Sequence, residues 1–175
     1  MFGRRRRLPA AQRPRLAADE RVLTWAPAAS GAEPPPVVVA TNLGLFLPDR
    51  PDRLGWHEIH RATWDGTTLT VIPGDVIEER PGYQVTADQG PVTVALSRPG
   101  DLPRVVRARI TRSVSYSSRH QLAGSGGVLV VARRVAGRDG LHWAVRYDPG
   151  TDPAAVRSAT DALVAHVTES FAPPA

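Results

Sequence analysis

The chain has 175 residues, of which 42% are hydrophobic and 22% charged, the composition of a globular protein that can bury a core. It contains no Cys and no Lys, so disulfides, thiolate metal sites, Schiff-base lysines and Walker-type lysines are excluded. All 22 basic residues are therefore Arg, which binds carboxylates and phosphates through a planar fork, and the net charge is +5.

The N-terminal segment carries a run of four arginines: Arg4, Arg5, Arg6 and Arg7. Residues 1–14 have little apolar area to offset the entropy of ordering, which predicts a disordered basic tail. No apolar stretch follows the basic start, and no run approaches the ~20 apolar residues of a membrane-spanning helix. We therefore expect a cytoplasmic protein.

Short strands are predicted next. The sequence ERVLTWAPAA over residues 20–29 is rich in β-branched and aromatic residues and predicts a first strand. VVVATN and LGLFLP, together residues 37–48, predict two strands that turn at Thr41 and Asn42, because Asn tolerates the left-handed backbone of a tight turn.

Further hairpins are predicted towards the middle of the chain. The segment over residues 54–64 lacks simple alternation and requires a bulge or a turn near residues 57–58. Asp65-Gly66 is a strong hairpin signal, with residues 67–73 as the returning strand. Residues 83–97 predict another hairpin.

Two amphipathic helices are predicted. The first begins at Asp101, with apolar residues at helical spacing and arginines on the opposite face, although Arg109 falls inside the apolar arc. Its apolar positions are Leu102, Val105, Val106 and Ile110, and the opposite arginines are Arg104, Arg107 and Arg112. The second helix begins with Asp152 as its N-cap and Pro153 as its first residue. Its expected buried stripe is Val156, Leu163, Val167 and Phe171.

Between the helices, residues 113–122 predict a strand, and residues 128–135 and 141–147 predict a hairpin. The order of elements lacks βαβ alternation, so a parallel nucleotide-binding sheet is not indicated. The predicted fold class is mainly β (α+β), with antiparallel sheets and two amphipathic helices.

The strand pattern resembles bacterial pleckstrin-homology-like (PH-like) domains, in which a T-[DN]-x-[RG]-L hairpin precedes an [IL]-P-[WY]-x-[ED]-I strand. The matching positions are Thr41, Asn42, Leu43, Gly44, Leu45, Leu54, Trp56, Glu58 and Ile59. Gly55 departs from the pattern, which often has Pro there. The chain is also similar to proteins of high-GC actinobacteria.

The resemblance implies a small curved barrel of two antiparallel sheets, plugged by a helix and used for binding or scaffolding. It covers about a third of the chain. We expect a single domain over residues 15–172, with a PH-like core over 15–112. Residues 113–172 are expected to add a β-hairpin and a C-terminal helix packed on the same core.

Several patterns invite a catalytic or metal-binding interpretation. His57 and His60 with Glu58 could hold a metal on a helix, but on a strand the two histidines point to opposite faces. Ser115, Ser117, Ser118 and His120 lack the G-x-S-x-G setting of an activated serine. We therefore expect a strand wall at the histidines and ordinary polar strand positions at the serines.

Two further patterns have simpler interpretations. Asp75, Glu78 and Glu79 lie in a loop-like stretch, where a solvated charge cluster is expected. The glycine-rich segment over residues 123–127 opens a strand and not a helix, so a turn is favoured over a phosphate loop. No catalytic residue, metal or cofactor is predicted.

The arginines are the remaining functional signal. One interpretation is that the exposed arginines serve only solubility. The other is that they bind an anionic partner. The candidate binding residues are Arg4, Arg5, Arg6, Arg7, Arg104, Arg107 and Arg112. The function expected first is a non-enzymatic binding or scaffolding module peripheral to the inner membrane face. The alternative is an adaptor for an acidic protein or a nucleic-acid backbone. Sequence-specific nucleic-acid recognition is not expected, because the aromatic pattern that it requires is lacking. An enzyme of unknown class is the third possibility.

Overall fold

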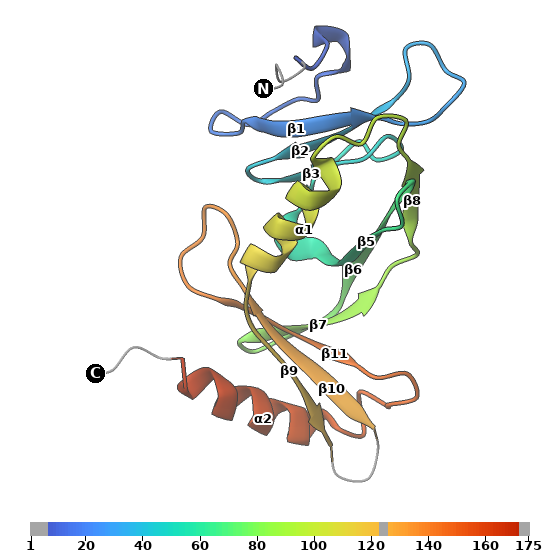
Figure 1. Cartoon of the computed structure of the whole chain (residues 1–175). Coiled ribbons are helices and arrows are strands. Elements are labelled where there is room, and N and C mark those ends of the chain that lie inside the picture. Colours follow the sequence, from blue (N-terminus) through green and yellow to red (C-terminus); the bar gives the residue numbers. More distant parts are fainter. Residues whose placement is uncertain (1–6, 123–125, 172–175) are drawn as a thin grey trace. The chain divides into compact units, whose positions relative to one another are not determined.

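The computed structural model describes residues 7–122 and 126–171 (Figure 1). Of these residues, 42% lie in strands and 19% in helices, so the mainly β class predicted from the sequence is confirmed. They divide into two compact units. The first unit comprises residues 7–73 and 90–112, and the second comprises 74–89 and 113–171. One boundary between the units lies near residue 112, and residues 74–89 belong to the second unit.

The first unit contains a four-stranded antiparallel sheet in the order β1-β2-β3-β4, and β6 pairs with both β5 and β8. Its elements are η1 (Ala10–Gln12), β1 (Val22–Pro27), β2 (Val37–Thr41), β3 (Gly44–Phe46), β4 (Leu54–Gly55), η2 (Trp56–Glu58), β5 (Ile59–Trp64), the first half of β6 (Thr68–Arg80), β8 (Val92–Ala95) and α1 (Leu102–Ser113). The two sheets meet where Ala28 bridges Leu96.

The turn between β2 and β3 is held by one threonine. The buried Thr41 Oγ1 accepts hydrogen bonds from the backbone N–H groups of Leu43 (3.1 Å) and Gly44 (3.0 Å). The Trp56 indole N–H donates to the Thr41 carbonyl at 3.1 Å. Thr41 and Trp56 therefore satisfy backbone groups that burial would otherwise leave unpaired, while Leu45, Leu54 and Ile59 of the same sequence pattern lie in the apolar core.

Helix α1 closes the core of the first unit. Leu102 and Val106 are fully buried, and Val105 and Ile110 pack partly buried against the same cluster. The apolar face predicted for this helix is therefore confirmed. Burial of this face stabilises a helix of only three turns, which would be marginal on its own.

The second unit is a sheet in the order β6-β7-β11-β10-β9, with a helix. Its elements are the second half of β6, β7 (Tyr83–Asp88), β9 (Val114–Gln121), β10 (Gly127–Arg133), β11 (His142–Tyr147) and α2 (Arg157–Glu169). β7 and β11 run parallel, and the other neighbours are antiparallel. Val128, Val130 and Val145 lie in its fully buried core, together with Val164 and Val167 of α2.

Two predictions about the strands were wrong. Residues 74–80, expected as a loop, continue β6 and pair with β7 around a bulge between Val76 and Glu78. Residues 83–97 do not form a hairpin, because β7 pairs with β6 and β11 whereas β8 pairs with the first half of β6. The second error concerns partners that are distant in sequence, which local patterns do not specify, whereas the first missed a hairpin between neighbouring residues such as Arg80 and Tyr83.

The C-terminal helix begins later than predicted. Asp152 caps only a turn, through its bond to the Ala154 N–H at 3.0 Å, and α2 starts at Arg157. The buried stripe contains Val156, Thr160, Val164 and Val167. Leu163 is only partly buried, and Phe171 is 44% exposed, although its ring packs edge-on against Tyr116 and Trp143.

Candidate functional site

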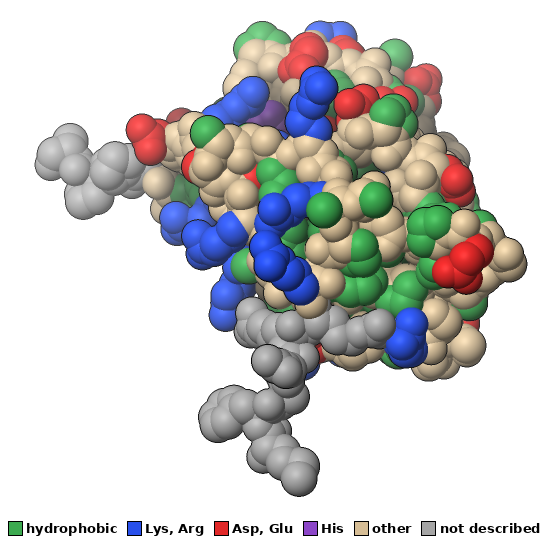
Figure 2. Space-filling view, turned by 90° about the horizontal axis from the view of Figure 1, so that it is seen from above, with side chains coloured by type: hydrophobic (Ala, Val, Ile, Leu, Met, Phe, Trp, Pro, Cys, Tyr) green, Lys and Arg blue, Asp and Glu red, His purple; other side chains and the backbone are tan. Residues whose placement is uncertain are grey.

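A groove runs beside β1 in the first unit. Its larger part, about 650 Å³, lies between the N-terminal segment, β1 and the loop that leads into α1. Apolar side chains from Leu8, Leu23 and Trp25 line it, together with three arginines: Arg7, Arg13 and Arg98. In the space-filling view from above, arginine side chains lie beside hydrophobic ones (Figure 2).

A smaller hollow of about 200 Å³ lies between Leu23 of β1 and one face of α1. It is lined by Arg104, Arg109 and Arg112, with Val105 and Ala108 between them. The two hollows share Leu23 and Asp101 in their linings. We treat them as one surface, called the basic groove.

The basic groove has little negative charge of its own. Asp101 is the one acidic residue in its described lining, and it already accepts bonds from Thr24 Oγ1 (2.5 Å) and from Arg104 (3.5 Å). Burial lowers the pKa of the Arg109 guanidinium, and the neighbouring charges of Arg112 and Arg21 lower it further. A partly buried cation beside two others favours an anion between them.

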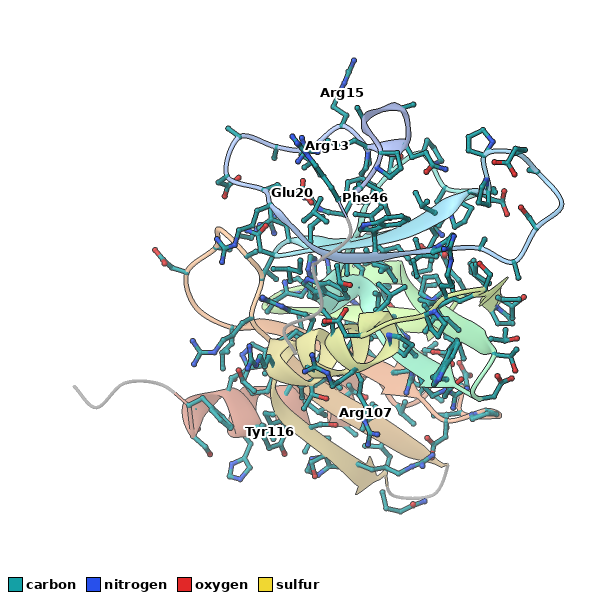
Figure 3. All side chains as sticks on the ribbon, turned by 45° about the horizontal axis from the view of Figure 1, so that its top comes forward. Arg13, Arg15, Glu20, Phe46, Arg107 and Tyr116 are labelled. Atoms are coloured by element: carbon teal, nitrogen blue, oxygen red, sulfur yellow. The ribbon has the colours of Figure 1, made fainter. Side chains whose placement is uncertain are left out.

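The structure places the arginines predicted from sequence in different positions. Arg7, Arg104 and Arg112 line the basic groove. Arg107 does not line either hollow, and its side chain projects from α1 on the side away from β1 (Figure 3). Arg4, Arg5 and Arg6 lie outside the described residues.

Sequence reasoning missed three arginines of the groove: Arg13, Arg98 and Arg109. Arg109 did carry a signal, because it is the charged residue inside the apolar arc of α1 and so must lie at the edge of the core. Arg13 was assigned to a disordered tail. It follows η1, and the neighbouring Gln12 side chain donates to the Pro35 carbonyl. Figure 3 shows Arg13 on this segment above β1.

The segment that carries His57 and His60 forms η2 and β5 of the first unit. Trp56 and Ile59 are buried, Trp64 is partly buried, and η2 supplies the turn expected near residues 57–58. Glu58 accepts a hydrogen bond from the Gly55 N–H at 2.6 Å, which closes this turn. No group of three or more metal-ligating side chains occurs within residues 7–122 and 126–171.

The serines and acidic residues considered for catalysis lie in the second unit. Ser115, Ser117 and Ser118 lie on β9, and His120 on the same strand is 3.2 Å from the Tyr116 hydroxyl. The acidic residues of β6 belong to a strand and not to a loop. The two carboxylate oxygens of Glu78 accept bonds from Arg80 and Arg157, each at 2.8 Å, so this carboxylate has a structural role.

A buried polar network holds α2 on the sheet of the second unit. The Arg80 side chain is 1% exposed and donates to Glu78 (2.8 Å), to the Tyr83 hydroxyl (2.9 Å) and to the Tyr147 hydroxyl (3.1 Å). The Tyr83 hydroxyl donates to Asp161 of α2 at 2.5 Å. Every hydroxyl of this network has a partner in the same unit, so we interpret it as structural.

The network makes the stability of the second unit sensitive to high pH. Burial, followed by the hydrogen bond to Asp161, raises the pKa of Tyr83 from its ordinary 10.0 to about 12. Above pH 10 the unfolded chain loses this proton while the folded chain keeps it, so the free energy of unfolding falls between pH 10 and about 12. The free energy of unfolding, measured with urea across this pH range, should decline less steeply for Tyr83→Phe than for the parent protein. Equal declines in the two proteins would show that Tyr83 is not the group responsible.

Comparison with family models, with curated proteins and with solved structures finds no match for this chain. Within the part of the chain that the structure describes, no helix has the length and apolar character needed to cross a membrane.

Proposed function

We propose that the chain is a non-enzymatic binding module, whose first unit has a PH-like fold and whose basic groove holds an anionic partner. The arrangement of the first unit supports the fold assignment. A four-stranded antiparallel sheet is followed by three further antiparallel strands and then by a helix that closes the core. The hairpin and strand of the PH-like sequence pattern supply buried residues of that core.

The basic groove is the observation that carries the functional proposal. Six arginines line it against one carboxylate, Asp101, which is already bonded to Thr24 and Arg104. Guanidinium groups stay charged at physiological pH, so they bind anions well and serve poorly as acids or bases. This chemistry favours binding over catalysis.

Two kinds of anionic partner fit this groove. In the first, the chain is a peripheral protein that binds an anionic membrane surface from the cytoplasm. In the second, it is an adaptor that binds an acidic protein or a nucleic-acid backbone. Both require the same groove arginines, and both lose affinity when salt screens the charges, as the Debye length falls from about 10 Å at 0.1 M to about 3 Å at 1 M.

The test compares two variants of equal net charge. Replacing Arg104, Arg109 and Arg112 by Gln should weaken binding to phosphatidylserine-containing vesicles or to polyglutamate by about a hundredfold, at about 1 kcal/mol per arginine. The matched control replaces three exposed arginines outside the groove, Arg61, Arg134 and Arg138, by Gln. Equal losses in the two variants would mean that net charge alone drives binding, and the groove would have no part in it.

A further inference from the structure

The basic groove is elongated. β1, the N-terminal segment and the loop before α1 line the larger hollow, whereas α1 and Leu23 line the smaller one. The lining of the larger hollow extends along β1 from Val22 to Pro27, about 16 Å at 3.3 Å per residue, so this hollow alone matches about five residues of extended polypeptide.

The arginines belong to two groups along this length. Arg7, Arg13 and Arg98 line the larger hollow, whereas Arg104, Arg109 and Arg112 line the smaller one. A single phosphate or carboxylate would occupy one group and leave the other without an anion. A ligand with several negative charges spaced along a chain would satisfy both groups.

The floor between the arginines is apolar. Leu23 lines both hollows, with Trp25 on one side of it and Val105 and Ala108 on the other. Arg109 is partly buried beside this floor, so a flat bilayer would reach the protruding arginines and leave the floor uncovered. An extended chain alternates its side chains between two sides, and it can direct apolar groups to the floor and carboxylates to the arginines.

We propose that the partner held in the basic groove is an extended acidic polypeptide segment in which apolar side chains alternate with carboxylates. This inference rests on the function proposed above, because it names the partner of the same groove. The apolar side chains cover Leu23 and its neighbours. The carboxylates pair with the two groups of arginines, where the fork of each guanidinium can donate hydrogen bonds to both oxygens of a carboxylate.

The experiment uses the full-length chain and a fluorescein-labelled peptide of four Glu-Leu repeats, followed by fluorescence anisotropy at low salt. Two matched peptides carry Gln in place of Glu, or Ser in place of Leu. We expect the Glu-Leu peptide to bind at least about tenfold more tightly than either, because each lacks one of the two contacts. Inorganic phosphate at the same concentration should not displace it.

Variants locate the peptide on the protein. Arg112→Gln and Leu23→Ser should each weaken binding of the Glu-Leu peptide about tenfold, while Arg61→Gln should change it less than about twofold. Arg112 is exposed, so its replacement tests the groove even if Leu23→Ser loosens the fold. Replacing both Arg104 and Arg112 by Glu should weaken binding of the Glu-Leu peptide more than Arg112→Gln does, because repulsive charges then stand in place of two attractive ones.

The outcomes separate this inference from the proposed function. Binding to phosphatidylserine vesicles that depends on the groove arginines, with no binding of the Glu-Leu peptide, would overturn the peptide inference and leave the proposed function standing. Equal binding of the Glu-Leu and Glu-Ser peptides would also overturn it, since the apolar floor would then contribute nothing. If the full-length chain bound neither the Glu-Leu peptide nor phosphatidylserine vesicles nor polyglutamate, both the peptide inference and the proposed function would be refuted.

Discussion

Arg80→Ala is expected to lower the free energy of unfolding of the second unit by about 3 kcal/mol. Removing one partner of a buried ion pair costs about 3 to 5 kcal/mol, and the lower value applies here because the Glu78 side chain is 32% exposed. The substitution also removes the donors to the Tyr83 and Tyr147 hydroxyls. Urea unfolding followed by circular dichroism measures the loss.

Hydrogen exchange should locate this effect. Peptides from β7, β11 and α2 should exchange faster in the Arg80→Ala variant, whereas peptides from β1, β2 and β3 should be unchanged, because the network lies within the second unit. Arg104→Ala is the matched control, since its side chain is 77% exposed and its ion pair is long, at 3.5 Å. A control loss of more than about 0.5 kcal/mol, or an equal loss in both variants, would contradict the prediction.

Glu20→Ala should destabilise the first unit to a similar extent, by about 3 kcal/mol. The Glu20 side chain is fully buried and accepts bonds from Arg53 Nη1 (2.6 Å), Thr41 Oγ1 (2.6 Å) and the Ala17 N–H (3.1 Å). Its removal leaves the Arg53 charge and the Thr41 hydroxyl without their carboxylate at the turn between β2 and β3. Tryptophan fluorescence in a Trp143→Phe background reports this loss, because the other tryptophans lie in the first unit.

Two companion variants make the Glu20 result specific. Glu20→Gln keeps one acceptor oxygen and should lose less than Glu20→Ala, because that oxygen can still accept from Arg53 and the Ala17 N–H, which both bond to Oε2. Glu33→Ala, at an exposed position, should stay within about 0.5 kcal/mol of the parent protein. A Glu20→Ala protein as stable as Glu33→Ala would show that the buried carboxylate contributes nothing to the first unit.

Only part of the basic groove could be predicted from the sequence. The arginine run and the arginine-bearing face of α1 pointed to an anionic partner, and Arg7, Arg104 and Arg112 do line the basic groove. The groove itself could not be predicted, because its walls come from residues as far apart as Arg7 and Arg112. A helical projection places Arg109 in the apolar arc, but it does not show that Leu23 of β1 lies across the same hollow.

Local signals determined the elements whose partners are close in sequence. Thr41 specifies the turn from β2 to β3 through side-chain bonds to nearby backbone, and the spacing of Leu102 and Val106 specifies the buried face of α1. The left-handed backbone expected at Asn42 is not found, and its side chain bonds instead to the backbone of Asp19 and Arg21. The tertiary structure alone decided that β7 pairs with β11 and that β8 pairs with the first half of β6. It also decided that Arg80, one charged residue among many in the sequence, is buried with two tyrosines. The physical reason is that strand pairing and charge burial depend on groups distant along the chain, whereas turns and helix faces depend on neighbours a few residues away.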